Sequence, residues 1–366
     1  MKEVNKEFLL GPINRGRVLA IFASGICLLL VSSGLAQPGD SPSTDAALPK
    51  NTISKIVTVQ PDAEEIVVSP DSSTLYVVGE SPAPSISVID VKNDYVVKAT
   101  IPLSSGSYPI YLALTPDGRT LYVTNGSDPG AVSVIDVTQM NYPVIATINV
   151  EIYPQRVAVS PDGKEAYIAN PTQGTISVIA TATNQVTATI NCKGNPFLPL
   201  FTGNGKQVDV LNEAGTGFVQ LINPISGVVS TSVAGGGAFM FPTGMTTDRS
   251  GSTLYITSQY NCVVAMRASD GAVTKEILAA SNSFSFVSLG QPALTPSGKY
   301  LYVPANRELT PPPETFVTMI DVVTGQIVGP LINLADPPFW AQTSPDGKNL
   351  YVSSLDGTLT VIDITQ

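Results

Sequence analysis

The sequence predicts an all-β protein, a seven-bladed β-propeller of four-stranded antiparallel blades. Three observations predict it. A hairpin motif occurs seven times at similar spacing, further strand patterns follow each copy, and a spare strand precedes the first copy. Periods of about 40 to 50 residues are typical of propeller blades. We therefore take each repeat as one blade.

The repeated motif is an eleven-residue hairpin of the form TPDGRTLYVTN. The seven copies align without a gap and begin at Ser69, Thr115, Ser160, Thr202, Asp248, Thr295 and Ser344. Proline at the second position presets φ for a turn, and Asp and Gly follow where the chain reverses. Glycine fills the fourth position in six copies, whereas Ser72 takes it in the first. Each motif thus predicts two strands joined by a tight turn with a left-handed residue.

Two more strands follow each of the first six hairpins, and one follows the seventh. Alternating segments such as Ser87–Asp90 and Ser133–Asp136 predict the third strands, and Val96–Ile101 and Gln185–Ile190 predict fourth strands. The seventh unit ends after its third strand. We expect residues 53–59 to supply the missing strand, because a terminal strand that completes the last blade closes the ring and removes its open edges.

The chain divides into three predicted segments. Residues 1–36 have the order of a secretory signal peptide: basic residues, an apolar run from Val18 to Val31, and small residues up to Ala36. An uncleaved membrane anchor is the alternative. Residues 37–52 are rich in Pro, Ser and Asp and predict a disordered linker. Residues 53–366 form the propeller. We expect an exported, periplasmic or extracellular, monomeric protein.

The composition excludes several functions. The net charge is −10, and the first 36 residues are themselves basic, so nucleic acid and anionic membrane surfaces are not expected partners of the mature domain. The chain contains no histidine. Imidazole ligation of haem or copper and Ser-His-Asp catalysis are therefore excluded. We expect no cofactor, no metal site and no catalytic set. The sequence does not decide whether Cys192 and Cys262 form a disulfide.

The motif Leu121-Tyr122-Val123-Thr124-Asn125, with Pro-Asp-Gly before it and Ser-Val-Ile-Asp after it, resembles the YVTN-repeat family of seven-bladed propellers. The resemblance covers about residues 53–366. It implies an exported bacterial or archaeal protein. Related propellers occur in d1-haem nitrite reductases, nitrous oxide reductase and lactonase-like hydrolases, but the redox chemistry of the first two needs histidine and is not implied here. The fold alone does not imply a function.

Candidate ligand-binding residues lie where each blade begins at the channel mouth. Four positions before the start of each hairpin motif, the seven units place Glu65, Tyr111, Arg156, Leu198, Gly244, Gln291 and Trp340. Structural repeats should agree with one another, and these residues differ. Of these we expect Glu65, Tyr111, Arg156, Gln291 and Trp340 to converge on a ligand. Phe239, Phe241, Phe284 and Phe286 in long connections could add apolar walls. The alternative is that the aromatics plug the channel and that Arg156 and Glu65 form an ordinary ion pair.

A second irregularity lies inside the repeat. Six copies of the motif share a tyrosine in the LYV strand, but the fourth copy has Asp209 instead. A buried, unpaired carboxylate is costly, so Asp209 either reaches solvent or a neighbouring donor, or acts as a special ligand or acid–base group.

The expected function is non-catalytic: an exported binding module for a protein, peptide or small ligand at the loop-rich face and channel mouth. The alternative is a lactonase-like or other hydrolase that uses carboxylates in the channel, with or without the help of a metal ion. Clustered acids or an oxygen-ligated cation at the mouth would favour the enzyme. An apolar patch with few perturbed carboxylates would favour binding.

Overall fold

The computed structural model describes residues 48–80, 83–104, 108–213, 217–234, 241–279, 287–307 and 313–366. These residues form strands and turns without a helix. The predicted signal peptide, most of the predicted linker, and Phe239, Phe284 and Phe286 lie outside the described residues. Within the part that is described, no helix is long and apolar enough to cross a membrane.

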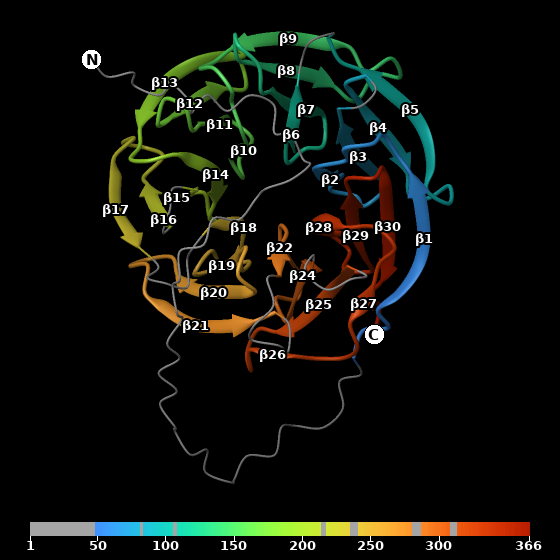
Figure 1. The fold of residues 1–366 in the computed structure, drawn as a ribbon. Coiled ribbons are helices and arrows are strands. Elements are labelled where there is room, and N and C mark those ends of the chain that lie inside the picture. Colours follow the sequence, from blue (N-terminus) through green and yellow to red (C-terminus); the bar gives the residue numbers. More distant parts are fainter. Residues whose placement is uncertain are drawn as a thin grey trace, which may run out of the picture. The chain divides into compact units, whose positions relative to one another are not determined.

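Seven antiparallel sheets are arranged in a ring, and each runs from an inner strand near the axis to an outer strand at the rim (Figure 1). This confirms the predicted seven-bladed propeller. Blades 1 to 3 contain β2 (Ile66–Val68), β3 (Thr74–Gly79), β4 (Ser85–Asp90) and β5 (Val96–Pro102); β6 (Pro109–Leu114), β7 (Thr120–Asn125), β8 (Ala131–Asp136) and β9 (Val144–Asn149); and β10 (Val157–Val159), β11 (Glu165–Asn170), β12 (Thr175–Ala180) and β13 (Gln185–Asn191).

Blades 4 and 5 follow the same order. They contain β14 (Pro196–Phe201), β15 (Val208–Asn212), β16 (Phe218–Ile222) and β17 (Val229–Ala234), and then β18 (Pro242–Thr247), β19 (Thr253–Ser258), β20 (Cys262–Arg267) and β21 (Val273–Leu278). Cys192 and Cys262 are free and half-buried, so the pairing that the sequence left open does not form here.

Blade 6 has broken inner and outer strands. Its central pair is β24 (Tyr300–Arg307) and β25 (Glu314–Asp321). The short strands β22 (Ser288–Leu289) and β23 (Ala293–Leu294) pair with β24, and β26 (Gln326–Ile327) and β27 (Ile332–Asn333) pair with β25. The inner break falls at Gly290–Pro292, where the axial residue Gln291 lies.

Blade 7 joins the two ends of the propeller. It consists of β28 (Pro338–Thr343), β29 (Asn349–Ser354), β30 (Thr358–Asp363) and, at the rim, β1 (Thr52–Thr58). Strand β1 pairs with β30 from Thr52 opposite Asp363 to Thr58 opposite Thr358, and the two lie side by side in Figure 1. The predicted closing strand is thus confirmed, one residue earlier than the sequence indicated.

The hairpin turns follow the predicted chemistry. In blade 2 the Thr115 hydroxyl donates to Asp117 Oδ1 at 2.6 Å, Asp117 accepts from the Arg119 amide, and Gly118 has φ of +71°. The Asp side chain therefore satisfies backbone donors within its own turn. The same hydroxyl–carboxylate pair occurs in blades 1, 3 and 7, and Ser72 adopts φ of +58° where the others have glycine. These repeated acids are structural.

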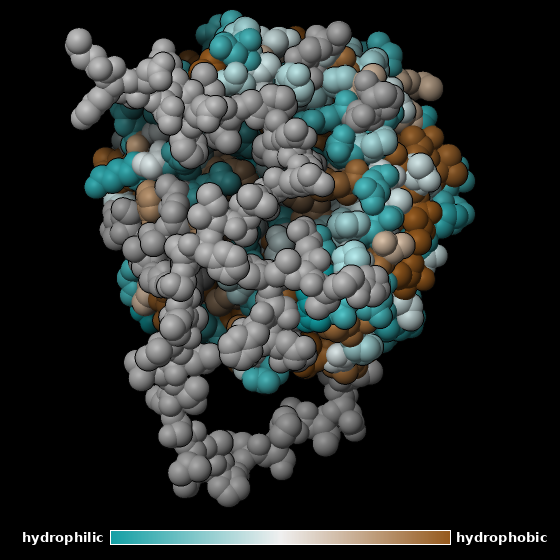
Figure 2. All heavy atoms as spheres, viewed as in Figure 1, coloured by the Kyte–Doolittle hydropathy of each residue, from teal (hydrophilic) through white to brown (hydrophobic). Residues whose placement is uncertain are grey.

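The hydrophobic core lies between neighbouring blades, and the rim strands expose part of their apolar side chains. Ile53 and Ile56 of β1 and Val96 of β5 are exposed. Figure 2 shows hydrophobic residues in brown along the right-hand rim, where Figure 1 places β1. The centre of each blade is, by contrast, shielded from solvent: every residue of β3 is buried.

Candidate functional site

Four inner strands share a local irregularity that brings the residues at their start to the propeller axis. In blades 2, 4, 5 and 7 the inner strand begins with a proline, and its register slips by one residue before the axial position. The slip is a β-bulge, which re-aims side chains at the rim of a sheet. In blades 2, 4 and 7 two consecutive side chains, of the bulged residue and of the axial residue, thus lie near the axis, whereas the axial residue of blade 5 is Gly244 and has no side chain.

Arg156 is the centre of the axial cluster. Its side chain is buried, with the residue 4% exposed, and its guanidinium carbon lies 4.4 Å from the ring centroid of Trp340 and 4.8 Å from those of Tyr111 and Phe197. A cation held against aromatic faces in a desolvated site gains about 2 kcal/mol or more per good contact. The three rings therefore offset part of the cost of burying the charge.

Gln291 links Arg156 to blade 5. Its Oε1 accepts a hydrogen bond from Arg156 Nη1 at 2.8 Å and another from the Met245 amide at 3.2 Å, while its Nε2 donates to the Met245 carbonyl at 2.8 Å. A Cβ on Gly244 would come within 2.6 Å of this Oε1. The glycine at the axial position of blade 5 is thus required by the Gln291 side chain.

Glu65 lies in the same cluster but does not form an ion pair with Arg156 within the described part of the chain. Its Oε2 accepts a hydrogen bond from the Leu112 amide at 2.6 Å. Burial raises the pKa of Glu65 to about 8, against the opposing charge of Arg156. Glu65 is therefore mainly protonated at neutral pH and does not neutralise Arg156.

Two further carboxyl groups lie in the field of this cluster. Glu64 is buried, and its charge raises the pKa of Glu65 and of Tyr111. Glu213 directly follows β15 and is exposed as a residue. Partial burial of its carboxyl raises the pKa of Glu213, and the charge of Arg156 opposes that rise. No pairing within 4 Å between Arg156 and an acid occurs among the described residues.

A cavity of about 230 Å³ lies beside Arg156 on the face where the inner strands begin. Arg156, Gln291 and Phe339 contribute to its wall, with Leu289 and Pro338 adding apolar surface. Arg156 Nε and Trp340 Nε1 are buried without a hydrogen-bond partner among the described residues. Because such donors are costly to leave unpaired, this end of the axis favours a ligand that accepts hydrogen bonds.

The structure brings together the five predicted residues Glu65, Tyr111, Arg156, Gln291 and Trp340, although only Arg156 and Gln291 line the cavity. The aromatics also pack on one another, with Tyr111 6.4 Å from Trp340 and 6.2 Å from Phe197. The channel-plug alternative also involved Phe239, Phe284 and Phe286, which lie outside the described residues, so it stays open. The ordinary Arg156–Glu65 ion pair is not found among the residues described.

Phe197 and Phe339 belong to the candidate site but were not predicted from the sequence: Phe197 contacts Arg156, and Phe339 lines the cavity. Both precede an axial position by one residue and belong to the bulged pairs. A regular strand would turn them away from the axis. The available signal was the proline immediately before each of them, since a proline at the start of an inner strand accompanies the bulge here. Leu198 and Gly244 were not among the five residues expected to bind a ligand. Neither makes a hydrogen bond or a cation–π contact with Arg156 among the described residues.

Asp209 lies away from this cluster, in the second strand of blade 4. It does not line the axial cavity. Among the described residues, no group of three or more acids or cysteines is arranged to hold a metal ion. The polar and aromatic groups of the axial cluster are the guanidinium of Arg156, the amide of Gln291 and the rings around Arg156.

Comparisons with known proteins support the propeller class. A family model described as "Lactonase, 7-bladed beta-propeller" matches residues 74–193, from β3 of blade 1 to just past the end of β13. A chain of the Kuenenia stuttgartiensis hydrazine synthase structure is similar over 83% of this chain and 96% of its own, with a TM-score of 0.71 and 22% identity. No curated protein matches. The chain is thus a seven-bladed β-propeller, and the structural likeness at this identity concerns the fold alone.

Proposed function

We propose that this propeller is a binding module that holds a small carboxylate-bearing ligand in the axial cavity. The observation that carries the proposal is Arg156, a buried guanidinium that lines the cavity and keeps an unpartnered Nε among the described residues. Guanidinium groups bind carboxylates through parallel, charge-assisted hydrogen bonds. A carboxylate would provide the missing acceptor and the negative charge that Glu65 does not supply.

The electrostatics of the axis limit the charge of the ligand. Glu65 is protonated at neutral pH because burial raises its pKa to about 8, so it leaves Arg156 available to an anion. The guanidinium lies inside an otherwise acidic chain of net charge −10, and Glu64 is buried close by. Long-range steering would therefore oppose anions, and the local guanidinium has to provide the affinity. We expect a ligand with one carboxylate rather than several.

The size of the cavity limits the ligand further. Its volume of about 230 Å³ is below the range of about 300–1,000 Å³ that is typical of small-molecule sites. The wall combines Arg156 and Gln291 with Leu289, Pro338 and Phe339. Such a site suits a short carboxylic acid with an apolar body.

A thermal-shift screen tests this proposal. Short carboxylic acids are compared with the corresponding primary amides, and a ligand at a hundred times its dissociation constant should stabilise the fold by about 2.7 kcal/mol. Arg156→Gln should abolish the shift by the acids. Arg119→Gln is the matched control, because Arg119 is an exposed arginine on the turn of blade 2. The proposal fails if amides stabilise as much as acids, or if Arg156→Gln keeps the response.

Lactone hydrolysis is the second candidate, favoured by the family-model match over residues 74–193. Opening a lactone with water yields a hydroxy acid, whose carboxylate is the group that Arg156 would bind. Glu65 is mainly protonated at neutral pH and could therefore serve as a proton donor, but it does not line the cavity. Incubation with short-chain lactones and titration of released acid distinguishes the two: acid release lost in Glu65→Gln would favour the enzyme.

Membership of the YVTN-repeat family and export from the cell are part of the same proposal. The repeated Tyr-Val motif and the order of basic, apolar and small residues before position 37 support them. Cell fractionation and N-terminal sequencing of the mature protein would test export. A mature chain that begins near Gln37 is expected, and a chain that keeps residues 1–36 in the cytoplasm would contradict it.

A further inference from the structure

The axial cavity has a buried end and an open end. Arg156 and Gln291, which line the buried end, are 4% and 9% exposed. Gln259 and Ser288 line the same cavity but are exposed residues. Gln259 directly follows β19 and Ser288 begins β22, so both lie on the face where the inner strands begin. A ligand that binds Arg156 therefore extends past Gln259 and Ser288 toward solvent.

The open end provides hydrogen-bonding groups that the fold does not use. Neither the side-chain amide of Gln259 nor the hydroxyl of Ser288 makes a hydrogen bond with another described residue. The Gln291 amide, by contrast, already bonds with Arg156 and with the backbone of Met245. An amide and a hydroxyl each donate and accept hydrogen bonds. The open end therefore suits a ligand group that also does both through separate atoms, such as an amide.

The wall of the cavity contains a cation and no acid. Among the described residues that line it, Arg156 is the only one with a charged side chain. The ammonium group of a free amino acid would lie beside this guanidinium without a carboxylate to pair with, which is costly. An amino acid whose nitrogen is acylated has a neutral amide there instead. The charge of the wall thus favours the acylated form.

We propose that the axial cavity binds an N-acylated amino acid, the unit that also ends a polypeptide chain. The inference rests on the proposed function, because its carboxylate is the one that Arg156 binds. It places the amide of the ligand at Gln259 and Ser288, which line the open end.

The remaining wall indicates which amino acid fits. Leu289, Pro338 and Phe339 present apolar surface, so a side chain such as that of leucine is preferred. The volume of about 230 Å³ is below the usual range of small-molecule sites. We therefore expect the cavity to enclose one residue and to leave any preceding chain outside.

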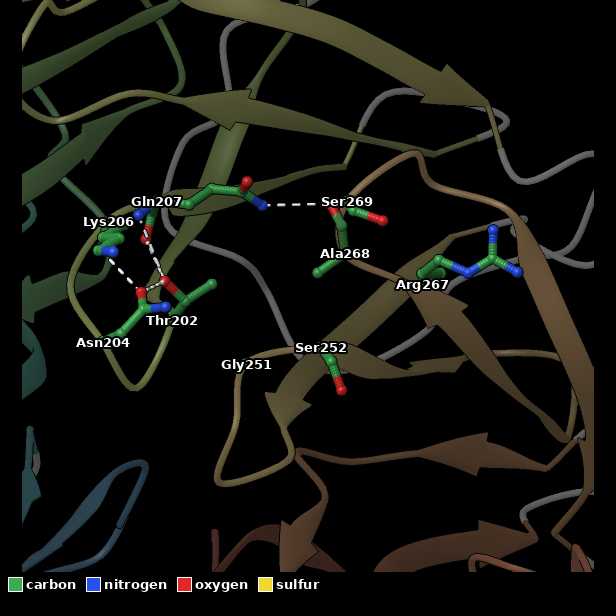
Figure 3. A pocket seen from close by; sticks show the side chains of 9 residues that line it. All are labelled: Thr202, Asn204, Lys206, Gln207, Gly251, Ser252, Arg267, Ala268 and Ser269. Carbon is green, nitrogen blue, oxygen red and sulfur yellow. Dashed lines mark hydrogen bonds between the residues drawn. The ribbon is translucent and has the colours of Figure 1, made fainter.

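A second cavity offers an acid a different environment. It measures about 290 Å³, lies between turns of blades 4 and 5, and has two cations in its wall, Lys206 and Arg267. Both residues are exposed, and Arg267 pairs with Asp270 at 2.6 Å. Figure 3 shows the Arg267 guanidinium pointing away from Gln207. Because salt screens exposed charges, we expect only weak, salt-sensitive binding of acids there.

Isothermal titration calorimetry on the full chain tests the proposal with matched ligands. N-Acetyl-leucine should bind about fivefold more tightly than 4-methylpentanoate, which lacks only the acetamido group, since one net hydrogen bond has about that effect. Leucine, whose nitrogen is charged, and 2-hydroxy-4-methylpentanoate, which has a hydroxyl in place of the amide, should bind more weakly than N-acetyl-leucine. N-Acetyl-leucinamide lacks the carboxylate and should not bind.

The peptide acetyl-Gly-Gly-Leu separates two sources of the ligand. Binding at least as tight as that of N-acetyl-leucine would assign the site to the C-terminus of a polypeptide. Exclusion of the peptide would assign it to free N-acylated amino acids. Both results support recognition of the acylated unit.

Substitutions locate the amide of the ligand. Gln259→Met removes the side-chain amide at similar length, so the affinity for N-acetyl-leucine should fall about fivefold, to that for 4-methylpentanoate. Gln185→Met is the matched control, because Gln185 is an exposed glutamine of the rim strand β13. Lys206→Gln changes the wall of the second cavity and should leave N-acetyl-leucine binding unchanged.

The outcomes separate this inference from the proposed function. If no acid binds, or if N-acetyl-leucinamide binds as tightly as N-acetyl-leucine, both are overturned. If 4-methylpentanoate, leucine or the hydroxy acid binds as tightly as N-acetyl-leucine, carboxylate binding stands and the acylated amino acid is wrong. The same holds if Gln259→Met keeps the preference for N-acetyl-leucine.

Discussion

Arg156 and Asp209, like Glu65, are ionisable residues that are buried without an ion pair in the described part of the chain, and these two differ in how they are accommodated. Arg156 is held by three aromatic faces and the Gln291 amide. Asp209 has one hydrogen bond, from Gln207, and so is stabilised mainly by taking up a proton. The carboxyl of Asp209 therefore changes its charge near neutral pH.

Asp209→Asn should remove a pH-dependent cost. Burial raises the pKa of Asp209 from 3.8 to about 7, so the folded chain binds an extra proton between about pH 4 and pH 7. Stability that is fully present below pH 4 is then lost as the pH rises through 7. At about 1.4 kcal/mol per pKa unit, the loss is up to about 4 kcal/mol. Urea unfolding from pH 4 to pH 8 should show the variant gaining on the parent as the pH rises.

Asp162→Asn is the control for that series. Asp162 is largely exposed, and a hydrogen bond from the Ser160 hydroxyl lowers its pKa to about 2. Its contribution is present above pH 4 and is lost only as the pH falls through about 2. The control should therefore run parallel to the parent from pH 4 to pH 8. If Asp209→Asn also runs parallel, the buried carboxyl is not the titrating group.

The axial cluster shows which individual residues of the candidate site could be predicted from the sequence. The spacing of the repeat placed Arg156, Gln291 and Trp340 at the axis, because every blade begins at the same distance from its hairpin. Phe197 and Phe339 were not predicted, since a β-bulge reverses the direction in which a strand residue points and leaves no periodic signal. That the phenyl and indole rings stack on Arg156 likewise depends on contacts between blades.

At the scale of the element, the hairpin is the unit that the sequence predicts best. Its proline, acid and glycine are local signals, and the turns have the predicted left-handed residue at the fourth position. The break of the inner strand of blade 6 was not predicted, because it follows from the neighbouring blades: Gly290 packs against the Phe339 carbonyl, and Gln291 bonds with Met245 of blade 5. Such contacts are not encoded in the hairpin motif.

Substitution of the turn glycines by alanine should reduce the free energy of unfolding by different amounts. Gly298 has φ of +72°, and no atom lies within 4 Å of the place that an added Cβ would take, so Gly298→Ala should cost only the left-handed backbone, about 1 kcal/mol. Gly251 has the same φ, but its Cβ would lie 2.6 Å from the Cβ of Thr202 in blade 4. Gly251→Ala should therefore cost at least twice as much in urea unfolding. Equal costs would mean that the two hairpins are not in firm contact.

At the scale of the molecule, ring closure depends on β1. A chain that begins at residue 60 lacks this strand and leaves the edge of β30 open. We expect it to melt at a lower temperature and to self-associate, because an open edge pairs with other strands. A chain that begins at residue 48 keeps β1 and should stay folded and monomeric. Light scattering and thermal unfolding measure both, and equal behaviour of the two chains would contradict closure by β1.

The pairing of β1 with β30 also determines when the ring can close during synthesis. The Ser54 hydroxyl meets the Val361 carbonyl, which lies 307 positions later in the chain. A ribosome adds about 5–20 residues per second, so β1 stays unpaired for tens of seconds until β30 has been synthesised. During that time the nascent propeller is an incomplete ring with an unpaired strand at its leading end. Protection of the newborn chain until its final blade has been made is therefore a requirement of this architecture.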